Sequence, residues 1–134
     1  MINWFTADSH YCHENIIKFT GRPFANSEHM NAELIKRHNA RVKNGDTVYH
    51  LGDFKMTNNG PNVYELLGKL NGRHVMVRGN HDKNNGLNAC LHYGVIELFN
   101  QQIILAHRPE ECEILMAVMS IKLGFCGHVH EKWK

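Results

Sequence analysis

The sequence lacks the features that mark disulfide-rich, membrane-spanning and secreted proteins. Its four cysteines form no C-x-x-C pair, which argues against a zinc ribbon and against a disulfide framework. No apolar stretch approaches the roughly 20 residues that a membrane helix needs. The first residues have neither the basic region nor the long apolar region of a signal peptide. We therefore expect a reduced, cytoplasmic protein without membrane contact.

Strong charge of one sign and low-complexity sequence are also absent. The 134 residues carry a net charge of +2, and 21% of them are charged, so disorder is not expected. This balance gives no indication of nucleic-acid binding, and it does not exclude an anionic substrate. No repeat or linker interrupts the chain, whose length suits one core. We expect a single domain over residues 1–134.

Short apolar runs alternate with segments of helical periodicity along the chain. The runs predict strands over residues 2–7, 47–51, 74–77, 95–99, 102–106 and 123–126. The helical segments cover residues 14–20, 28–42, 63–70, 87–92 and 109–122. Ser27 is the expected N-terminal cap of the second helix. The alternation of strands and helices predicts a layered α/β fold.

Histidine is the residue in excess, with 11 copies, and many of them follow the predicted strands. Four short segments place metal-binding residue types there: Asp8-Ser9-His10, Gly52-Asp53, Gly79-Asn80-His81-Asp82 and Gly127-His128-Val129-His130. In open α/β sheets, ligands bind beyond the carboxyl ends of the strands. We therefore expect a cluster of aspartate, histidine and asparagine side chains at one sheet edge, assembled from residues far apart in the sequence.

Some of these segments are weak evidence when taken alone. Asp8 and His10 flank one residue, so both can face a divalent metal, but a solvated loop with an incidental histidine fits equally well. Asp53 can bridge two metal ions about 3.5–4 Å apart, yet Gly-Asp is common in turns. His107, at the end of the strand over 102–106, taken alone fits a capping or partly buried role better than a ligand role.

The remaining segments are stronger evidence. Asn80 offers a neutral oxygen ligand, His81 a general acid, and Asp82 a partner that can orient the ring of His81. His128 and His130 are two residues apart and face the same side of an extended chain, which favours metal binding. Chance poorly explains ligand-type residues at the end of so many strands. The whole set predicts a site for two metal ions and points to metal-assisted hydrolysis.

The series Asp-x-His, Gly-Asp, Gly-Asn-His-Asp, His and Gly-His-x-His resembles the calcineurin-like metallophosphoesterase superfamily over residues 3–130. Residues 13–19, 21–24 and 46–54 are similar to small, cap-less bacterial and phage members. The resemblance implies one metallophosphoesterase domain with a four-layer αββα sandwich. Only four residues follow His130, so we expect a C-terminally truncated domain with a shortened second sheet. A missing strand would expose a sheet edge, which invites homo-oligomers.

The resemblance also implies a role for each site residue. The first metal ion would be held by Asp8, His10, Asp53 and His130, and the second by Asp53, Asn80, His107 and His128. Asp53 would bridge the two ions. His81 would face the scissile phosphate and assist the leaving group, with Asp82 as its partner. Mn²⁺ is the expected metal, although mixed oxygen and nitrogen ligands also accept Fe, Ni²⁺, Co²⁺ or Zn²⁺.

The implied activity is hydrolysis of a phosphoester. We expect a phosphodiesterase that acts on nucleotides or other small phosphodiesters through a hydroxide shared by the two metal ions. A phosphomonoesterase and a non-catalytic scaffold on the same fold are the alternatives. His13, Arg22 and Arg108 are candidate substrate contacts. His13 equally fits the cap of the helix that follows it, and both arginines fit ordinary surface positions.

Overall fold

The computed structural model describes residues 1–130 of the chain. Six strands and four helices follow one another in these residues: β1 (Asn3–Thr6), α1 (Glu14–Phe19), α2 (Ser27–Arg41), β2 (Thr47–Leu51), α3 (Val63–Gly68), β3 (Arg73–Val77), β4 (Gly94–Leu98), β5 (Gln101–Leu105), α4 (Pro109–Met119) and β6 (Leu123–Phe125). All six predicted strands are therefore found, with ends shifted by at most one residue.

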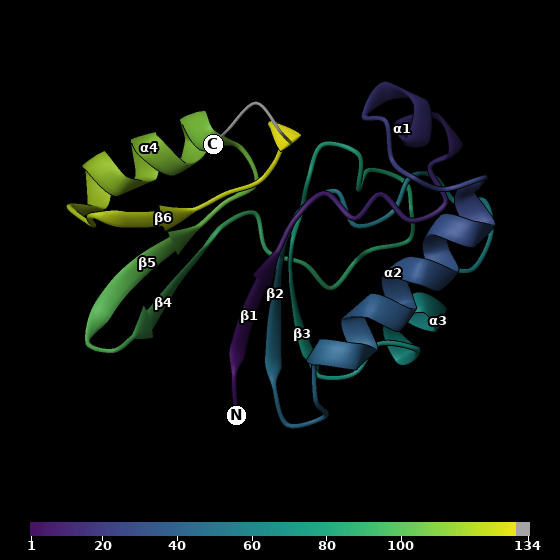
Figure 1. Cartoon of the computed structure of the whole chain (residues 1–134). Coiled ribbons are helices and arrows are strands. Elements are labelled where there is room, and N and C mark those ends of the chain that lie inside the picture. Colours follow the sequence, from purple (N-terminus) through teal and green to yellow (C-terminus); the bar gives the residue numbers. More distant parts are fainter. Residues whose placement is uncertain (131–134) are drawn as a thin grey trace.

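The strands form two three-stranded sheets. β1, β2 and β3 are parallel, with β2 in the centre. In the second sheet, β4 pairs antiparallel with β5, and β5 pairs parallel with β6. Helices α2 and α3 lie on the outer side of the first sheet, and α4 packs on β5 and β6 (Figure 1). The predicted four-layer αββα sandwich is confirmed.

Apolar side chains hold the two sheets together. Leu51 and Val77 of the first sheet form one buried cluster with Ile103 and Leu105 of the second sheet. Burial of such side chains contributes about 1.5–3 kcal/mol each, so this cluster fixes how the sheets face one another. The sheets therefore meet as rigid surfaces, which positions the loops at their ends.

The strand ends of both sheets converge on one region. The amide of Asp8, after β1, donates to the carbonyl of Gly52, after β2, at 3.0 Å. In the second sheet, the amide of Gly127, after β6, donates to the carbonyl of His107, after β5, at 2.9 Å. The expectation of a cluster at the edge of one sheet is thus wrong in one respect. The residues are assembled where the ends of two sheets meet.

The predicted helix over residues 87–92 is absent, and the segment is irregular. The side chain of Asn85 accepts a hydrogen bond from the amide of Leu87 at 2.9 Å. The amide of Leu91 then donates to Met76 of β3 at 2.8 Å. Pairing with a strand takes the place of helical hydrogen bonds, so tertiary contacts override the weak helical pattern.

The cap of α2 also differs from the prediction. The side chain of Asn26 accepts a hydrogen bond from the amide of His29 at 2.8 Å, and this is an N-cap contact. Ser27 is instead the first helical residue, and its amide donates to the carboxylate of Glu14 at 2.7 Å. An asparagine one position earlier supplies the cap because its side chain reaches the same amide groups.

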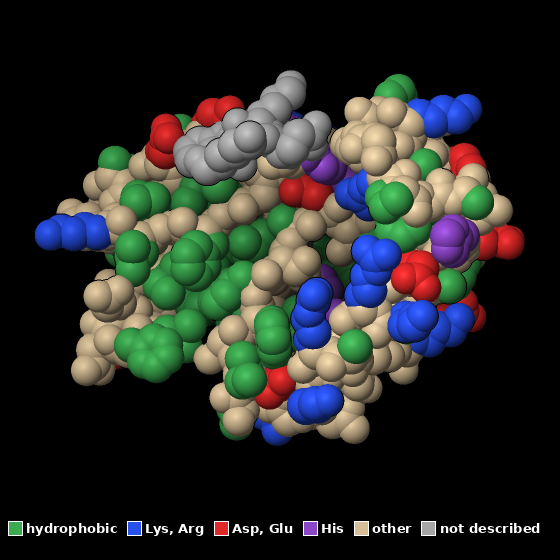
Figure 2. Space-filling model, in the orientation of Figure 1, with side chains coloured by type: hydrophobic (Ala, Val, Ile, Leu, Met, Phe, Trp, Pro, Cys, Tyr) green, Lys and Arg blue, Asp and Glu red, His purple; other side chains and the backbone are tan. Residues whose placement is uncertain are grey.

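The second sheet has an edge at β6, which pairs with β5 on one side in the described part of the chain. Hydrophobic side chains gather between the two sheets on the face shown in Figure 2. Pairing of this edge with another copy of the chain stays a prediction. Within residues 1–130, every helix is too short or too polar to cross a membrane.

Candidate metal centre

Two groups of ligand-type side chains lie where the strand ends meet. In the first group, Asp8, His10 and His130 each place one ligand atom within 4.8 Å of the others. Asp53, His107 and His128 form the second group with the same limit. The structure thus brings together six of the seven residues expected to bind metal. The seventh, Asn80, places its Oδ1 atom 3.0 Å from Nε2 of His107 and so belongs beside the second group.

Asp53 lies between the two groups. Its Oδ2 atom is 3.3 Å from Nε2 of His107 and 3.6 Å from Nε2 of His10, and both histidines are almost fully buried. Its other oxygen, Oδ1, accepts a hydrogen bond from the amide of His81 at 2.8 Å. One oxygen therefore faces an imidazole of each group while the other is fixed by the backbone. This is the placement that a bridging carboxylate needs.

The surroundings of Asp53 stabilise its charged form. Burial acts to raise its pKa, but hydrogen bonds from His107 and from the amide of His81, with the charges of His107 and His10, hold the pKa at about 2. Asp53 is a carboxylate at neutral pH. A carboxylate that is 2% exposed needs a positive partner, which protonated histidines or bound cations supply.

His10 has the properties of a nitrogen ligand for a metal ion. Burial lowers its pKa to about 3, so the ring is neutral at physiological pH and forms no ion pair with Asp53. Its Nδ1 atom lies 3.0 Å from Nδ1 of His13. Its Nε2 atom is buried and has no hydrogen-bond partner among the described residues. A cation between this atom and the Asp53 carboxylate would satisfy both, so the first group fits a metal ion.

In the second group, His107 is in the tautomer that leaves Nε2 available for metal binding. The carbonyl of Leu51 lies 2.7 Å from Nδ1 of His107, and a carbonyl can only accept. Nδ1 therefore carries a proton, and Nε2 faces Asp53 and Asn80. Burial acts to lower the pKa of His107, but the hydrogen bonds to Asp53 and to Leu51 raise it overall. Such a carbonyl contact is the usual device that orients a metal-ligating histidine.

Asp8 links the two ends of the sequence. Its carboxylate accepts from the amide of His128 at 2.9 and 3.1 Å, although 120 positions separate the two residues. Burial raises the pKa of Asp8, and the charges of His130 and His107 only partly offset this effect. The contact holds the loop after β6 against the loop after β1, and so it positions both histidines of that loop.

Five of the seven expected ligands adopt left-handed backbone conformations. The φ angles are 55° for Asp8, 54° for His10, 53° for Asp53, 75° for His128 and 50° for His130. Such conformations are uncommon for residues other than glycine and often cluster at functional sites. The tight turns point successive side chains into one small volume.

Two glycines allow the loops to approach one another. A Cβ atom on Gly52, whose φ angle is +95°, would collide with the ring of His107. A Cβ atom on Gly79 would collide with the carboxylate of Asp53. Glycine is therefore required at both positions because the backbone passes directly behind a candidate ligand.

The predicted role of Asp82 is corrected by the structure. Its carboxylate accepts from the backbone amides of Asp53 at 2.8 Å, Phe54 at 2.9 Å and Gly79 at 2.8 Å. The amide side chain of Asn85 donates to it at 3.0 Å. Both oxygens are thus engaged by the loops after β2 and β3, and they do not hold the ring of His81. Asp82 positions the candidate ligands through their backbone.

Asn85 is a supporting residue that the sequence did not indicate. It is 1% exposed, and its side-chain nitrogen donates to the carbonyl of Lys55 at 2.8 Å as well as to Asp82. In the sequence it is one of two adjacent asparagines in an apparent polar turn. Nothing in that local pattern distinguishes it from its exposed neighbour Asn84.

His81 and His13 stand beside the first group. The ring centroid of His81 is 5.3 Å from that of His10 and 5.8 Å from that of His13. The rings of His10 and His130 are 5.2 Å apart. His81 is therefore placed among the candidate ligands of the first group, while only its amide is used in binding Asp53.

The two arginines expected to bind substrate lie beside different ligand groups. Arg22 donates to the carbonyls of Ser9 at 2.8 Å and Asp8 at 2.7 Å, so it supports the first loop. It also lines a cavity of about 430 Å³ beside Asp8 and His130. Arg108 lines another cavity of about 430 Å³ beside His107. Contact of either arginine with substrate stays a prediction.

Comparison with known proteins shows the family. Residues 5–133 match the calcineurin-like phosphoesterase superfamily domain. The chain therefore belongs to this superfamily, whose members are typically hydrolytic phosphoesterases that use divalent metals. The two ligand groups described above are consistent with that chemistry.

One relative and two solved structures are similar to this chain. An uncharacterized protein from Methanocaldococcus jannaschii is 42% identical over 108 residues, which cover 80% of this chain and 58% of that protein. The chain thus spans less than two thirds of that relative. A protein of unknown function from Aquifex aeolicus has a TM-score of 0.80 at 28% identity, over 100% of this chain and 81% of its own. Vps29 from Entamoeba histolytica, in complex with zinc, has a TM-score of 0.56 at 21% identity, over 96% and 64% of the two chains.

Proposed function

We propose that this protein is a phosphodiesterase that uses two divalent metal ions and acts on nucleotides or other small phosphodiesters. The observation that carries the proposal is the position of Asp53. One of its oxygens faces an imidazole nitrogen of each ligand group, at 3.3 and 3.6 Å. A shared carboxylate between two ligand sets is the arrangement of two-metal hydrolases.

The ligand set determines which ions fit. Asp8, His10, His130 and Asp53 would hold one ion, and Asp53, Asn80, His107 and His128 would hold the other. Oxygen and imidazole donors without a thiolate suit Mn²⁺, and they also accept Fe, Co²⁺, Ni²⁺ or Zn²⁺. We propose Mn²⁺ as the working ion. When bound, the ions would supply Lewis-acid stabilisation of the phosphate charge and activation of water.

The chain itself would supply positioning and proton transfer. His81 lies beside the first ligand group and has its amide fixed on Asp53. Its imidazole is the candidate for donating a proton or a hydrogen bond to the leaving oxygen. Asp82 contributes by fixing the loops that carry Asp53 and Gly79. Arg22 and Arg108 would add positive charge on either side of a bound phosphate.

The cavities around the centre favour a diester over a monoester. One of them lies beside the first ligand group and the other beside the second, each with a volume of about 430 Å³. A phosphodiester carries a substituent on both sides of the phosphorus, so both cavities would be used. A small monoester would leave one of them to solvent.

A hydrolysis panel with Mn²⁺ tests this proposal. We expect the protein to hydrolyse bis-p-nitrophenyl phosphate faster than p-nitrophenyl phosphate, and Asp53→Ala to lose both activities. Faster turnover of the monoester would establish the phosphomonoesterase alternative. A folded, metal-loaded protein that hydrolyses neither ester, nor a set of cyclic and linear nucleotides, would establish the scaffold alternative.

A further inference from the structure

A cavity between α2 and the strands β1 and β2 lies apart from the candidate metal centre. None of the seven expected metal ligands lines it. Its volume of about 300 Å³ is at the lower end of the range of small-molecule sites, about 300–1,000 Å³. The face of the molecule shown in Figure 2 is hollowed between β1 and α2, and basic side chains gather beside the hollow.

The charged side chains that line this cavity are all basic in the described part of the chain: Arg37, Arg41 and, when protonated, His38. Arg37 already has partners within the chain. Its Nε atom lies 3.4 Å from the carboxylate of Glu33, and its guanidinium lies over the ring of Phe24. No hydrogen bond or ion pair within residues 1–130 engages the guanidinium of Arg41. An arginine fork without a carboxylate partner matches the geometry of a phosphate group.

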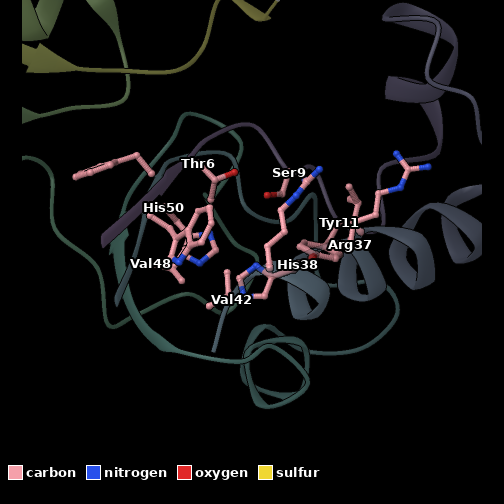
Figure 3. A pocket seen from close by; sticks show the side chains of 12 residues that line it. Thr6, Ser9, Tyr11, Arg37, His38, Val42, Val48 and His50 are labelled. Atoms are coloured by element: carbon pink, nitrogen blue, oxygen red, sulfur yellow. The ribbon is translucent and has the colours of Figure 1, made fainter. Parts of the chain in front are cut away.

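Three hydroxyl groups face the same cavity. Thr6 ends β1, and Ser9 and Tyr11 belong to the loop that follows it, so all three come from one short stretch (Figure 3). Their hydroxyl groups make no side-chain hydrogen bond to another described residue. Free hydroxyl donors next to an arginine are the groups with which proteins bind phosphate oxygens.

His50, on the strand side of the cavity, has an unsatisfied acceptor. Nε2 of His74 lies 3.3 Å from the carbonyl of Leu70, which can only accept, so this Nε2 carries the proton. In the neutral ring, Nδ1 of His74 is then an acceptor, and Nε2 of His50, 3.0 Å away, donates to it. Nδ1 of His50 is then an unprotonated acceptor, and this buried atom has no hydrogen-bond partner among the described residues.

The apolar part of the lining includes one fixed aromatic wall. Trp4 lines the cavity, and its indole N–H donates to the carboxylate of Asp46 at 3.0 Å, which holds the ring in place. Val42 and Val48 add aliphatic surface. A rigid indole with aliphatic neighbours favours a ligand that carries a flat, weakly polar ring in addition to a phosphate group.

We propose that this cavity binds a mononucleotide-like ligand, a phosphate monoester attached to a flat heterocycle with an N–H group. Arg41 and the hydroxyl groups of Thr6 and Ser9 would bind the phosphate. The heterocycle would lie against Trp4, with its N–H group toward His50. Ser9 and Tyr11 flank His10, so the ligand would contact the loop that carries a candidate metal ligand. This site is separate from the proposed catalytic one.

Trp4 provides a direct measurement of binding. We would titrate the full chain, loaded with Mn²⁺, with adenosine 5′-monophosphate, with adenosine and with inorganic phosphate, and follow tryptophan fluorescence. The sequence has two tryptophans, so Trp4→Phe identifies the signal of this cavity. We expect a saturable change with the nucleotide, and Kd values at least about tenfold weaker for each of its two halves.

Two charge variants test whether nucleotide binding depends on this cavity or only on the positive charge of the helix. Arg41→Met should weaken binding of the nucleotide about tenfold or more. Lys36→Met removes a charge from the same helix at a side chain that is 78% exposed, and should change Kd by less than about twofold. Thr6→Val tests the same site without altering charge, and should weaken binding a few-fold. The proposal is overturned by a nucleotide titration without saturation, by equal binding of adenosine, or by equal effects of the two charge variants.

Discussion

Two clusters of histidines lie beside the first sheet, and they differ in their surroundings. At its carboxyl edge, His10, His81 and His107 lie around the carboxylate of Asp53. On the side of α2, the ring of His74 lies between those of His50 and His38, with centroids 5.2 and 5.8 Å away and the rings tilted. The second cluster contacts backbone carbonyls instead, at Leu70 and Asn71.

The difference between the clusters lies in their acidic partners. Around Asp53 and Asp8 the imidazole nitrogens face carboxylates, and two sets of ligand atoms converge. Within residues 1–130, no such set forms around His50. Burial lowers the pKa of His50 to about 3, so this histidine remains neutral. In the described part of this chain, the carboxylates therefore mark which histidine cluster is the candidate cation site.

Removal of the Asp53 carboxylate from the first histidine cluster should have the largest effect on metal content and activity. We expect Asp53→Ala to lose bound metal and to lower kcat/KM about 10³-fold or more, because several kcal/mol of metal-assisted stabilisation would be lost. Metal content by mass spectrometry and initial rates with bis-p-nitrophenyl phosphate measure both effects.

Asp46→Asn is the matched control for Asp53→Ala. Asp46 is also a buried aspartate, 4% exposed, but its carboxylate accepts from Trp4 and from the backbone of Ile2 and Lys43. We expect this variant to be less stable but to keep its metal. Equal metal content in wild type and Asp53→Ala would show that Asp53 is not a ligand.

Removing His81 should separate catalysis from metal binding. We expect His81→Ala to keep both metal ions and to lower kcat about 10²–10³-fold, the usual contribution of a general acid. KM should change little, since the phosphate would still be held by the metal centre. His29→Ala, on the exposed surface of α2, is the control. Loss of metal in His81→Ala would make this residue a ligand and would refute the proton-transfer role.

The motifs at the strand ends were sufficient to predict which residues gather at the centre. Asp8, His10 and Asp53 each follow a strand of the parallel sheet, and parallel strands deliver their carboxyl ends to a common edge. Periodicity did not reveal that β5 and β6 belong to a second sheet. The packing of Leu51 against Ile103 and Leu105 decides that arrangement, and contacts between distant apolar runs leave no local pattern.

The roles of individual side chains were harder to predict than their location. Asp82 follows His81 directly, which suggested that it orients the ring of that histidine. Its carboxylate instead binds backbone amides, because the loops after β2 and β3 bring Asp53, Phe54 and Gly79 to its oxygens. Hydrogen bonding of this kind depends on loop conformation. The sequence shows the donor and acceptor types but not which of them meet.

The second histidine cluster should respond to mutation through stability. We expect His50→Ala to lower the free energy of unfolding by about 2–4 kcal/mol, because the ring is 3% exposed and its loss leaves a cavity beside Phe54. Metal content should be unchanged. Urea unfolding and metal analysis of the same sample test both parts. A variant with normal stability and reduced metal would assign His50 to the metal centre and remove the distinction between the clusters.

The smallest effect concerns the pH dependence of stability. Burial lowers the pKa of His50 to about 3 in the folded chain, whereas an unfolded histidine titrates near 6.5. Below about pH 6.5 the unfolded chain therefore binds a proton that the folded chain excludes. The contribution of His50 to stability falls as the pH drops through the window between these two values, by about 1.4 kcal/mol per pH unit.

His50→Phe preserves an aromatic ring at this position and removes the titration. We expect wild type to lose about 1.3 kcal/mol more stability than His50→Phe when the pH is lowered from about 7 to about 5.5. Both proteins keep the same metal centre, so its own pH dependence cancels in the comparison. Urea unfolding at the two pH values gives the four free energies. If the two proteins lose the same amount, His50 takes up a proton in the folded chain, and the contrast between a neutral histidine cluster and a cluster that faces carboxylates fails.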